Sequence, residues 1–185
     1  MPFLTAAVIL VGALCVLDLL LTFGVIRRLR EQNETLRLVR EQQSASAAES
    51  DIALPAGAAI GTFAATTVSG TPLSGADIDG RLLIGFFSPV CEPCKERMPQ
   101  FIEYATRFDG RVLAVASDEA GETDKTRDMV ARLGEVAEVV LEMDGGPVHQ
   151  AFGAKGYPAL LLVDPEGTVV ASGWEMSALP VPATL

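Results

Sequence analysis

Hydrophobic positions form one unbroken run near the start of the chain. The run FLTAAVILVGALCVLDLLLTFGVI covers residues 3–26 and has Asp18 as its only charged residue. At about 1.5 Å per residue, a helix of this length crosses the roughly 30 Å hydrocarbon core of a bilayer. We therefore predict that residues 1–26 form one transmembrane anchor, which attaches the protein to a membrane through residues 3–26.

Two other interpretations of this run fit less well. A cleaved secretory signal would carry basic residues before the run, but none precedes it, and RRLR follows where a cleavage motif would stand. A buried helix of a globular core would not be apolar on all faces and end in a basic cluster. Residues 27–43 favour helix and residues 44–50, SASAAES, are typical of a flexible link, so residues 27–53 are interpreted as a juxtamembrane helix and linker.

From residue 54 onward, short apolar segments alternate with helical ones. The expected order is a hairpin at 61–73, a buried strand at 81–87, a helix at 91–108, a strand at 112–117, a helix at 123–134, a strand-like segment at 138–144, a short helix at 147–153, and strands at 157–164 and 168–174. Strands separated by helices imply parallel crossovers, and the closing strand pair adds antiparallel members. The pattern predicts an α/β sandwich with a central mixed sheet.

Composition narrows the choice of partners. The chain has 185 residues, a mean hydropathy of +0.34, a net charge of −10 and a pI of about 4.5. Five arginines lie just after the apolar run, so the remainder is more acidic than the whole. An acidic domain is a poor partner for nucleic acid, which we therefore exclude.

The candidate chemistry lies in SPVCEPCKERMP, residues 88–99, directly after a predicted buried strand. At the start of a helix, unpaired backbone N–H groups and the helix dipole favour a thiolate, so Cys91 is assigned as the attacking nucleophile. Cys94 follows one turn later on the same face and is assigned as the resolving thiol. Pro93 is tolerated in a first turn and helps to hold the sulfurs in register, whereas the Glu92 carboxylate opposes thiolate formation and favours a reducing couple.

Two structural roles for the cysteine pair fit less well. The first is that both are buried residues without a reaction to perform, but two cysteines three apart at a helix start, in a chain whose third cysteine, Cys15, lies inside the predicted span, argue against it. A zinc site would need two further ligands, but there is no second Cys-x-x-Cys, and His149 is the only histidine. We expect no metal and no cofactor.

Two stretches, LLIGFFSPVCEPCKERMPQF at 82–101 and GYPALLLVDPEGTVVASG at 156–173, resemble the membrane-anchored thioredoxin-like thiol–disulfide oxidoreductases of the TlpA and ResA group, with a MauD-like feature in FFSPVC. The resemblance implies a thioredoxin-like fold preceded by the transmembrane helix. It also implies a cis peptide bond between Tyr157 and Pro158, which would lie against the cysteines and pair with an extended substrate. The implied partners are protein thiols or disulfides and an upstream electron donor; the oligomeric state is left open.

The sequence departs from this group at four places. Gly85 stands where thioredoxins place a buried acid, and Arg97 stands where many ResA-like members have a glutamate, with Glu96 beside it. Val90 replaces the tryptophan that usually precedes the first cysteine. After Trp174, prolines restrict helix formation, so we expect the usual C-terminal helix to be lost or much shortened, leaving its sheet face to a partner or to the juxtamembrane segment.

The side of the membrane is not fixed by the sequence. The related proteins act outside the cytoplasmic membrane, where disulfides persist, but five arginines after the span favour a cytoplasmic domain. We expect the thioredoxin-like domain to be extracytoplasmic.

Two alternative functions stay open beside a protein disulfide reductase. A thiol peroxidase would use Ser88, three residues before Cys91, although Ile84 stands where that motif has proline. A copper-binding protein would hold the metal with Cys91, Cys94 and His149, since sulfur and imidazole suit copper.

Overall fold

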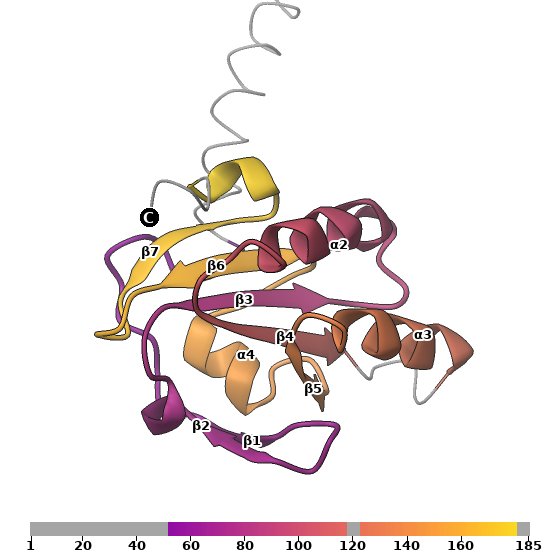
Figure 1. The fold of residues 1–185 in the computed structure, drawn as a ribbon, viewed down its shortest axis with the longest axis horizontal. Coiled ribbons are helices and arrows are strands. Elements are labelled where there is room, and N and C mark those ends of the chain that lie inside the picture. The colour runs from indigo at the N-terminus through magenta and orange to yellow at the C-terminus, as the bar shows by residue number, and fades with distance from the viewer. Residues whose placement is uncertain (1–51, 118–122, 181–185) are drawn as a thin grey trace, which may run out of the picture. The chain divides into compact units, whose positions relative to one another are not determined.

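The computed structural model describes residues 52–117 and 123–180 (Figure 1). The predicted anchor at 1–26 and residues 27–51 of the predicted juxtamembrane segment lie outside these ranges. Within them, none of the helices has both the length and the apolar character needed to cross a bilayer.

The domain is built on a five-stranded sheet in the order β5-β4-β3-β6-β7. Its strands are β3 (Leu82–Phe87), β4 (Arg111–Ser117), β5 (Glu138–Glu142), β6 (Ala159–Val163) and β7 (Val169–Gly173). The first three run parallel, and β6 and β7 pair antiparallel to their neighbours. Strands β3 and β6 are buried along their whole length, as expected for central strands without polar alternation. The predicted mixed central sheet is confirmed.

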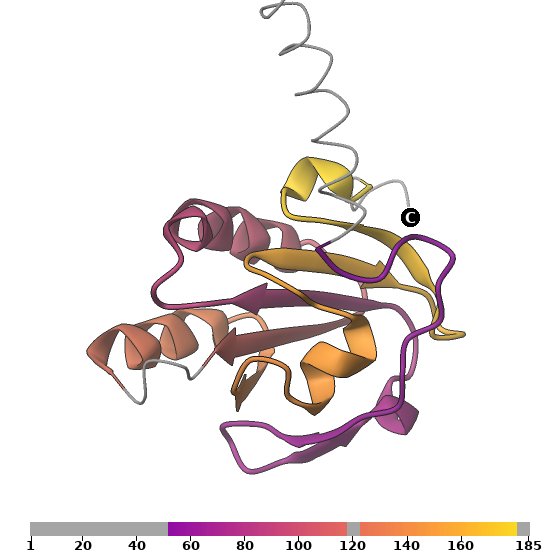
Figure 2. The same cartoon turned by 180° about the vertical axis from the view of Figure 1, so that it is seen from behind.

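Helices cover both faces of the sheet (Figures 1 and 2). One face carries α2 (Glu92–Ala105), α3 (Asp124–Leu133) and the 3₁₀ turn η2 (Met176–Ala178). The other face carries α4 (Pro147–Phe152) and a hairpin of β1 (Ala64–Thr66) and β2 (Pro72–Ser74). The hairpin leads into the 3₁₀ turn η1 (Gly75–Asp77). Helix α3 begins as predicted at Thr123, whose side chain accepts the N–H of Thr126.

The C-terminal segment covers the sheet face on which we expected the usual C-terminal helix to be lost or shortened. Up to residue 180 the only helical element after β7 is the single turn η2. Leu179 is nevertheless only 5% exposed and packs into the same hydrophobic cluster as α2, with Met176 beside it. The Tyr104 hydroxyl of α2 donates a hydrogen bond of 2.7 Å to the carbonyl of Pro180. The segment itself therefore lies over this face.

The packing around position 85 in β3 explains why glycine stands there. A Cβ atom at this position would lie 2.6 Å from the ring of Phe87 and 2.9 Å from the ring of Phe101. Both rings are fully buried and contact each other edge to face, with centroids 5.2 Å apart. The space that a buried acid would need beneath the helix is therefore filled by two aromatic rings.

We expect Gly85→Ala to lower the free energy of unfolding by about 1–3 kcal/mol, because neither buried ring can move without straining the core. Urea denaturation measures the change. Gly75→Ala is the matched control, since its Cβ would lie 3.6 Å from the Phe63 ring at ordinary contact distance, and the expected change is within about 0.5 kcal/mol. Equal midpoints for the two variants would contradict the packing argument.

Candidate active site

The cysteine pair lies where β3 passes into α2. Cys91 is the N-cap of the helix, and its sulfur accepts the backbone N–H of Cys94 at 3.2 Å. The two residues form a disulfide with their Cα atoms 5.3 Å apart. Cys91 is partly exposed, whereas Cys94 is only 3% exposed. Their environments therefore differ in the way that an attacking and a resolving sulfur require.

The loop before β6 closes the other side of the pair. The Tyr157–Pro158 peptide bond is cis, as the resemblance implied. The carbonyl oxygen of Tyr157 lies 3.5 Å from Cys91 Sγ, although the two residues are 66 positions apart. The structure thus brings Cys91, Cys94, Tyr157 and Pro158 together.

The first turn of α2 carries the remaining predicted residues. Pro93 lies within it, and Glu92 forms an exposed ion pair of 2.6 Å with Lys95. The lysine charge offsets part of the effect that the Glu92 carboxylate would otherwise have on Cys91, although an exposed pair is weak. Val90, directly before the nucleophile, is 65% exposed, so the position that usually carries tryptophan presents a small apolar surface.

Arg97, one turn after Cys94, points to the C-terminal segment. Its guanidinium forms an ion pair of 2.5 Å with Glu175 and lies over the ring of Trp174, 5.2 Å from the centroid. The carboxylate that pairs with Arg97 therefore comes from a segment distant in sequence and not from the neighbouring Glu96.

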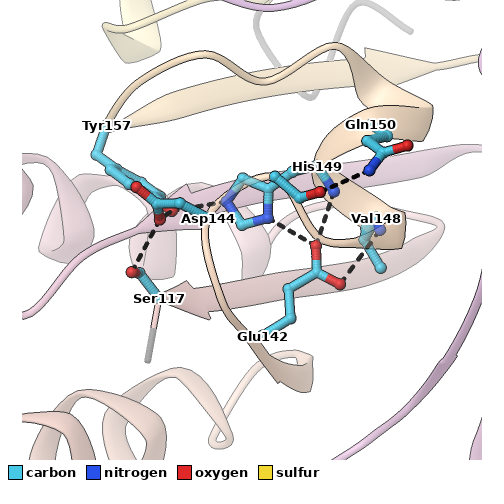
Figure 3. Close-up of polar contacts among 8 residues, drawn as sticks. Ser117, Glu142, Asp144, Val148, His149, Gln150 and Tyr157 are labelled. Atoms are coloured by element: carbon cyan, nitrogen blue, oxygen red, sulfur yellow. Dashed lines mark hydrogen bonds and ion pairs between the residues drawn. The ribbon is translucent and has the colours of Figure 1, made fainter. Parts of the chain in front are cut away.

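A polar network, buried at His149 and exposed at Asp144, includes the tyrosine of the cis-proline loop (Figure 3). His149 is 3% exposed; its Nδ1 lies 2.6 Å from a Glu142 carboxylate oxygen, and its Nε2 lies 2.7 Å from the Tyr157 hydroxyl. The Tyr157 hydroxyl donates to the Asp144 carboxylate, which also accepts the Ser117 hydroxyl at 3.1 Å. The network thus links β4, β5, α4 and the loop that faces Cys91.

The side chain of Glu142, in β5, caps the N-terminal end of α4. Its carboxylate accepts the backbone N–H groups of Val148, at 3.2 Å, and His149, at 2.8 Å. A Cβ atom on Gly146 would lie 2.6 Å from this carboxylate, so only glycine leaves room for it. Burial raises the pKa of Glu142, but hydrogen bonds from His149 and Val148 and the nearby imidazole outweigh it and hold the pKa below its usual value.

Sequence reasoning missed this network. The copper-binding alternative uses His149 together with Cys91 and Cys94, but both its ring nitrogens already have hydrogen-bond partners. The geometry is against that copper site, and within the described ranges no group of three or more His, Cys, Asp or Glu side chains could hold a metal. The available signal was the pair Gly145-Gly146 before Pro147, which marks a helix start without a capping side chain of its own.

Comparison with known proteins assigns the chain to a family. Residues 56–172 match the AhpC/TSA family, and the chain belongs to it. None of the curated protein sequences matches the chain.

Solved structures share the fold. The thioredoxin domain of a thiol-disulfide oxidoreductase from Bacteroides vulgatus has a TM-score of 0.57 and 23% identity, covering 68% of this chain and 93% of that one. A candidate thioredoxin from Neisseria meningitidis has a TM-score of 0.51 and 29% identity, covering 61% and 77%. A thio-disulfide isomerase from Thermus thermophilus has a TM-score of 0.53 and 22% identity, covering 66% and 87%. The described domain therefore has a thioredoxin-like fold.

Glu142→Gln should lower the free energy of unfolding by about 1–3 kcal/mol at pH 5.5, because a charged acceptor of several hydrogen bonds is lost. The pKa of Glu142 is lower in the folded chain than in the unfolded one, so the charged carboxylate stabilises the fold above about pH 4.3 and loses this effect as the pH falls further. The gap between wild type and variant should therefore narrow at pH 3.5, as measured by urea denaturation.

Glu103→Gln is the matched control for this measurement. It removes an exposed carboxylate paired with Arg107 at 2.9 Å, and we expect a change within about 0.5 kcal/mol at both pH values. A Glu142→Gln gap that keeps its size at pH 3.5 would rule out a charge-dependent role of this carboxylate.

Proposed function

We propose that the protein is a thiol–disulfide oxidoreductase that reduces disulfides of other proteins through Cys91 and Cys94. The observation that carries the proposal is the geometry of one sulfur atom. Cys91 is partly exposed, and its Sγ caps the first turn of α2, lies 3.5 Å from the Tyr157 carbonyl, and is bonded to the buried Cys94. Membership of the AhpC/TSA family and the thioredoxin-like fold support it.

The proposed reaction has two exchange steps. The Cys91 thiolate attacks one sulfur of the substrate disulfide; a mixed disulfide forms, and the leaving thiolate takes a proton from water. The Cys94 thiolate then attacks Cys91 Sγ, which releases the second substrate thiolate and leaves the Cys91–Cys94 disulfide. Two electrons pass to the substrate, and an upstream dithiol donor returns them to the pair.

Each group near the pair has a defined part in these steps. The N-terminal end of α2 and the Cys94 N–H favour the Cys91 thiolate, while the Glu92 carboxylate opposes it and favours reduction over oxidation of partners. The Tyr157 carbonyl, beside Cys91, is an acceptor for a backbone N–H of an extended substrate.

Cys94→Ser should trap the first intermediate, because the mixed disulfide at Cys91 is no longer resolved. After incubation of the reduced variant with oxidised insulin as a model protein disulfide, non-reducing electrophoresis should show a covalent adduct. Cys91→Ser is the matched control and should form none. No adduct with Cys94→Ser, together with no insulin reduction by wild type, would exclude the proposed activity.

A thiol peroxidase activity is the alternative to disulfide reduction for the same fold and cysteine pair. Ser88 Oγ is buried and accepts the N–H of Val90 at 3.4 Å, so it acts in the turn before the nucleophile. Fast consumption of hydrogen peroxide by the reduced protein, with slow disulfide exchange, would favour the peroxidase. Slow consumption with fast exchange would reject it.

We further propose that the protein is a membrane-tethered member of the TlpA and ResA group. The support for this assignment is the Cys-Glu-Pro-Cys tetrad with the downstream Tyr-Pro, and the apolar run at 3–26. We place the catalytic domain outside the cytoplasmic membrane, where protein disulfides occur.

Reporter fusions after Leu185 test this orientation. Alkaline phosphatase, which needs an oxidising compartment, should be active and should sediment with membranes, whereas a reporter that folds only in the cytoplasm should be inactive. The same fusions to residues 54–185 alone should stay soluble in the cytoplasm. The reverse pattern of activity for the full chain would place the domain inside.

A further inference from the structure

Tyr157 connects the candidate active site to the polar network. Its carbonyl oxygen faces Cys91 Sγ at 3.5 Å, while its hydroxyl lies among His149 and Asp144 on the other side of the loop (Figure 3). The His149 ring also packs against the Tyr157 ring, with centroids 5.7 Å apart and the planes close to perpendicular. One residue therefore joins the sulfur chemistry to a hydrogen-bonded histidine.

The hydrogen bonds of this network fix the position of the His149 ring. Nδ1 lies 2.6 Å from the Glu142 carboxylate, which is an acceptor when ionised. Nε2 lies 2.7 Å from the Tyr157 hydroxyl, and that hydroxyl donates to the Asp144 carboxylate. The imidazole is therefore held between Glu142 on one side and Tyr157 on the other.

The groups around His149 come from several elements. They are the Glu142 carboxylate from β5, the Tyr157 hydroxyl from the loop before β6, with the Asp144 carboxylate behind that hydroxyl, and the uncharged Phe86 ring of β3, 4.9 Å away. A ring that is hydrogen-bonded at both nitrogens and packed against an aromatic ring is held in one orientation by short, directional bonds.

We propose that His149, held by Glu142, is a positioning residue for the exchange reaction: through the Tyr157 hydroxyl it fixes the carbonyl that faces Cys91 and so favours extended peptide disulfides over small ones. The inference rests on the proposed oxidoreductase function. A loop held rigid before the substrate arrives costs less to order on binding. When the bond between His149 and the Tyr157 hydroxyl is removed, the loop is held less firmly.

The consequence is a difference between two kinds of substrate. Exchange with an extended peptide depends on the position of the Tyr157 carbonyl, because the peptide backbone pairs with it. A small disulfide makes no backbone bond to the loop, so its exchange should not depend on that position.

The test compares two substrates with the reduced full-length protein. One is a short linear peptide whose cysteine forms a mixed disulfide with thionitrobenzoate; the other is 5,5′-dithiobis(2-nitrobenzoate). Release of thionitrobenzoate gives kcat/KM for each substrate. For the peptide, Tyr157→Phe should lower kcat/KM about tenfold, as loss of one hydrogen bond to a charged group predicts. For the small disulfide the change should be less than twofold.

Tyr104→Phe is the matched control. It removes the tyrosine hydroxyl that donates to Pro180 on the opposite face of the sheet, and it should keep the wild-type kcat/KM for both substrates. His149→Gln is a second variant: it removes the ring that lies between Glu142 and Tyr157, and it should also lower kcat/KM for the peptide and not for the small disulfide. If Tyr157→Phe has the same kcat/KM for the peptide as Tyr104→Phe, the positioning role is wrong. If wild type exchanges with neither substrate, the proposed function itself has failed.

Discussion

The approach of Cys91 Sγ to the Tyr157 carbonyl is the contact on which the rest of the site depends. It joins the strand-to-helix junction of β3 and α2 to the loop before β6, two segments that are far apart in sequence and adjacent in the sheet. The sheet order makes this possible, because β3 pairs with both β4 and β6. Without that pairing, the sulfur would have a helix end on one side and no backbone acceptor on the other.

The elements that the sequence predicted well are those with strong local signals. The buried strand at 82–87, the helix with Thr123 as its cap, and the closing strand pair all depend on neighbouring residues, and their bounds differ from the predictions by a few positions. The helix predicted at 91–108 ends at Ala105, which leaves Phe108 to pack into the cluster beneath it. The position of the cysteines could be predicted for the same reason.

The parts that the sequence did not predict depend on contacts between distant residues. Glu142 caps a helix that begins five positions later, and Arg97 pairs with Glu175, 78 positions away. The sequence shows Glu96 beside Arg97, yet side chains one position apart on a helix point in different directions. Residue types alone do not reveal such pairings.

Phe87 and Phe101 have a further consequence for how protons move in this domain. Their rings occupy the interior beneath Cys94, and Gly85 leaves no acid there, whereas the buried titratable histidine of the described residues lies with Phe86 on the other face of the sheet. The buried histidine thus reaches the cysteine pair through Tyr157, across the sheet from Cys94. Since position 85 offers no carboxylate, a proton that Cys94 gains or loses must be exchanged with water or with an acid outside β3.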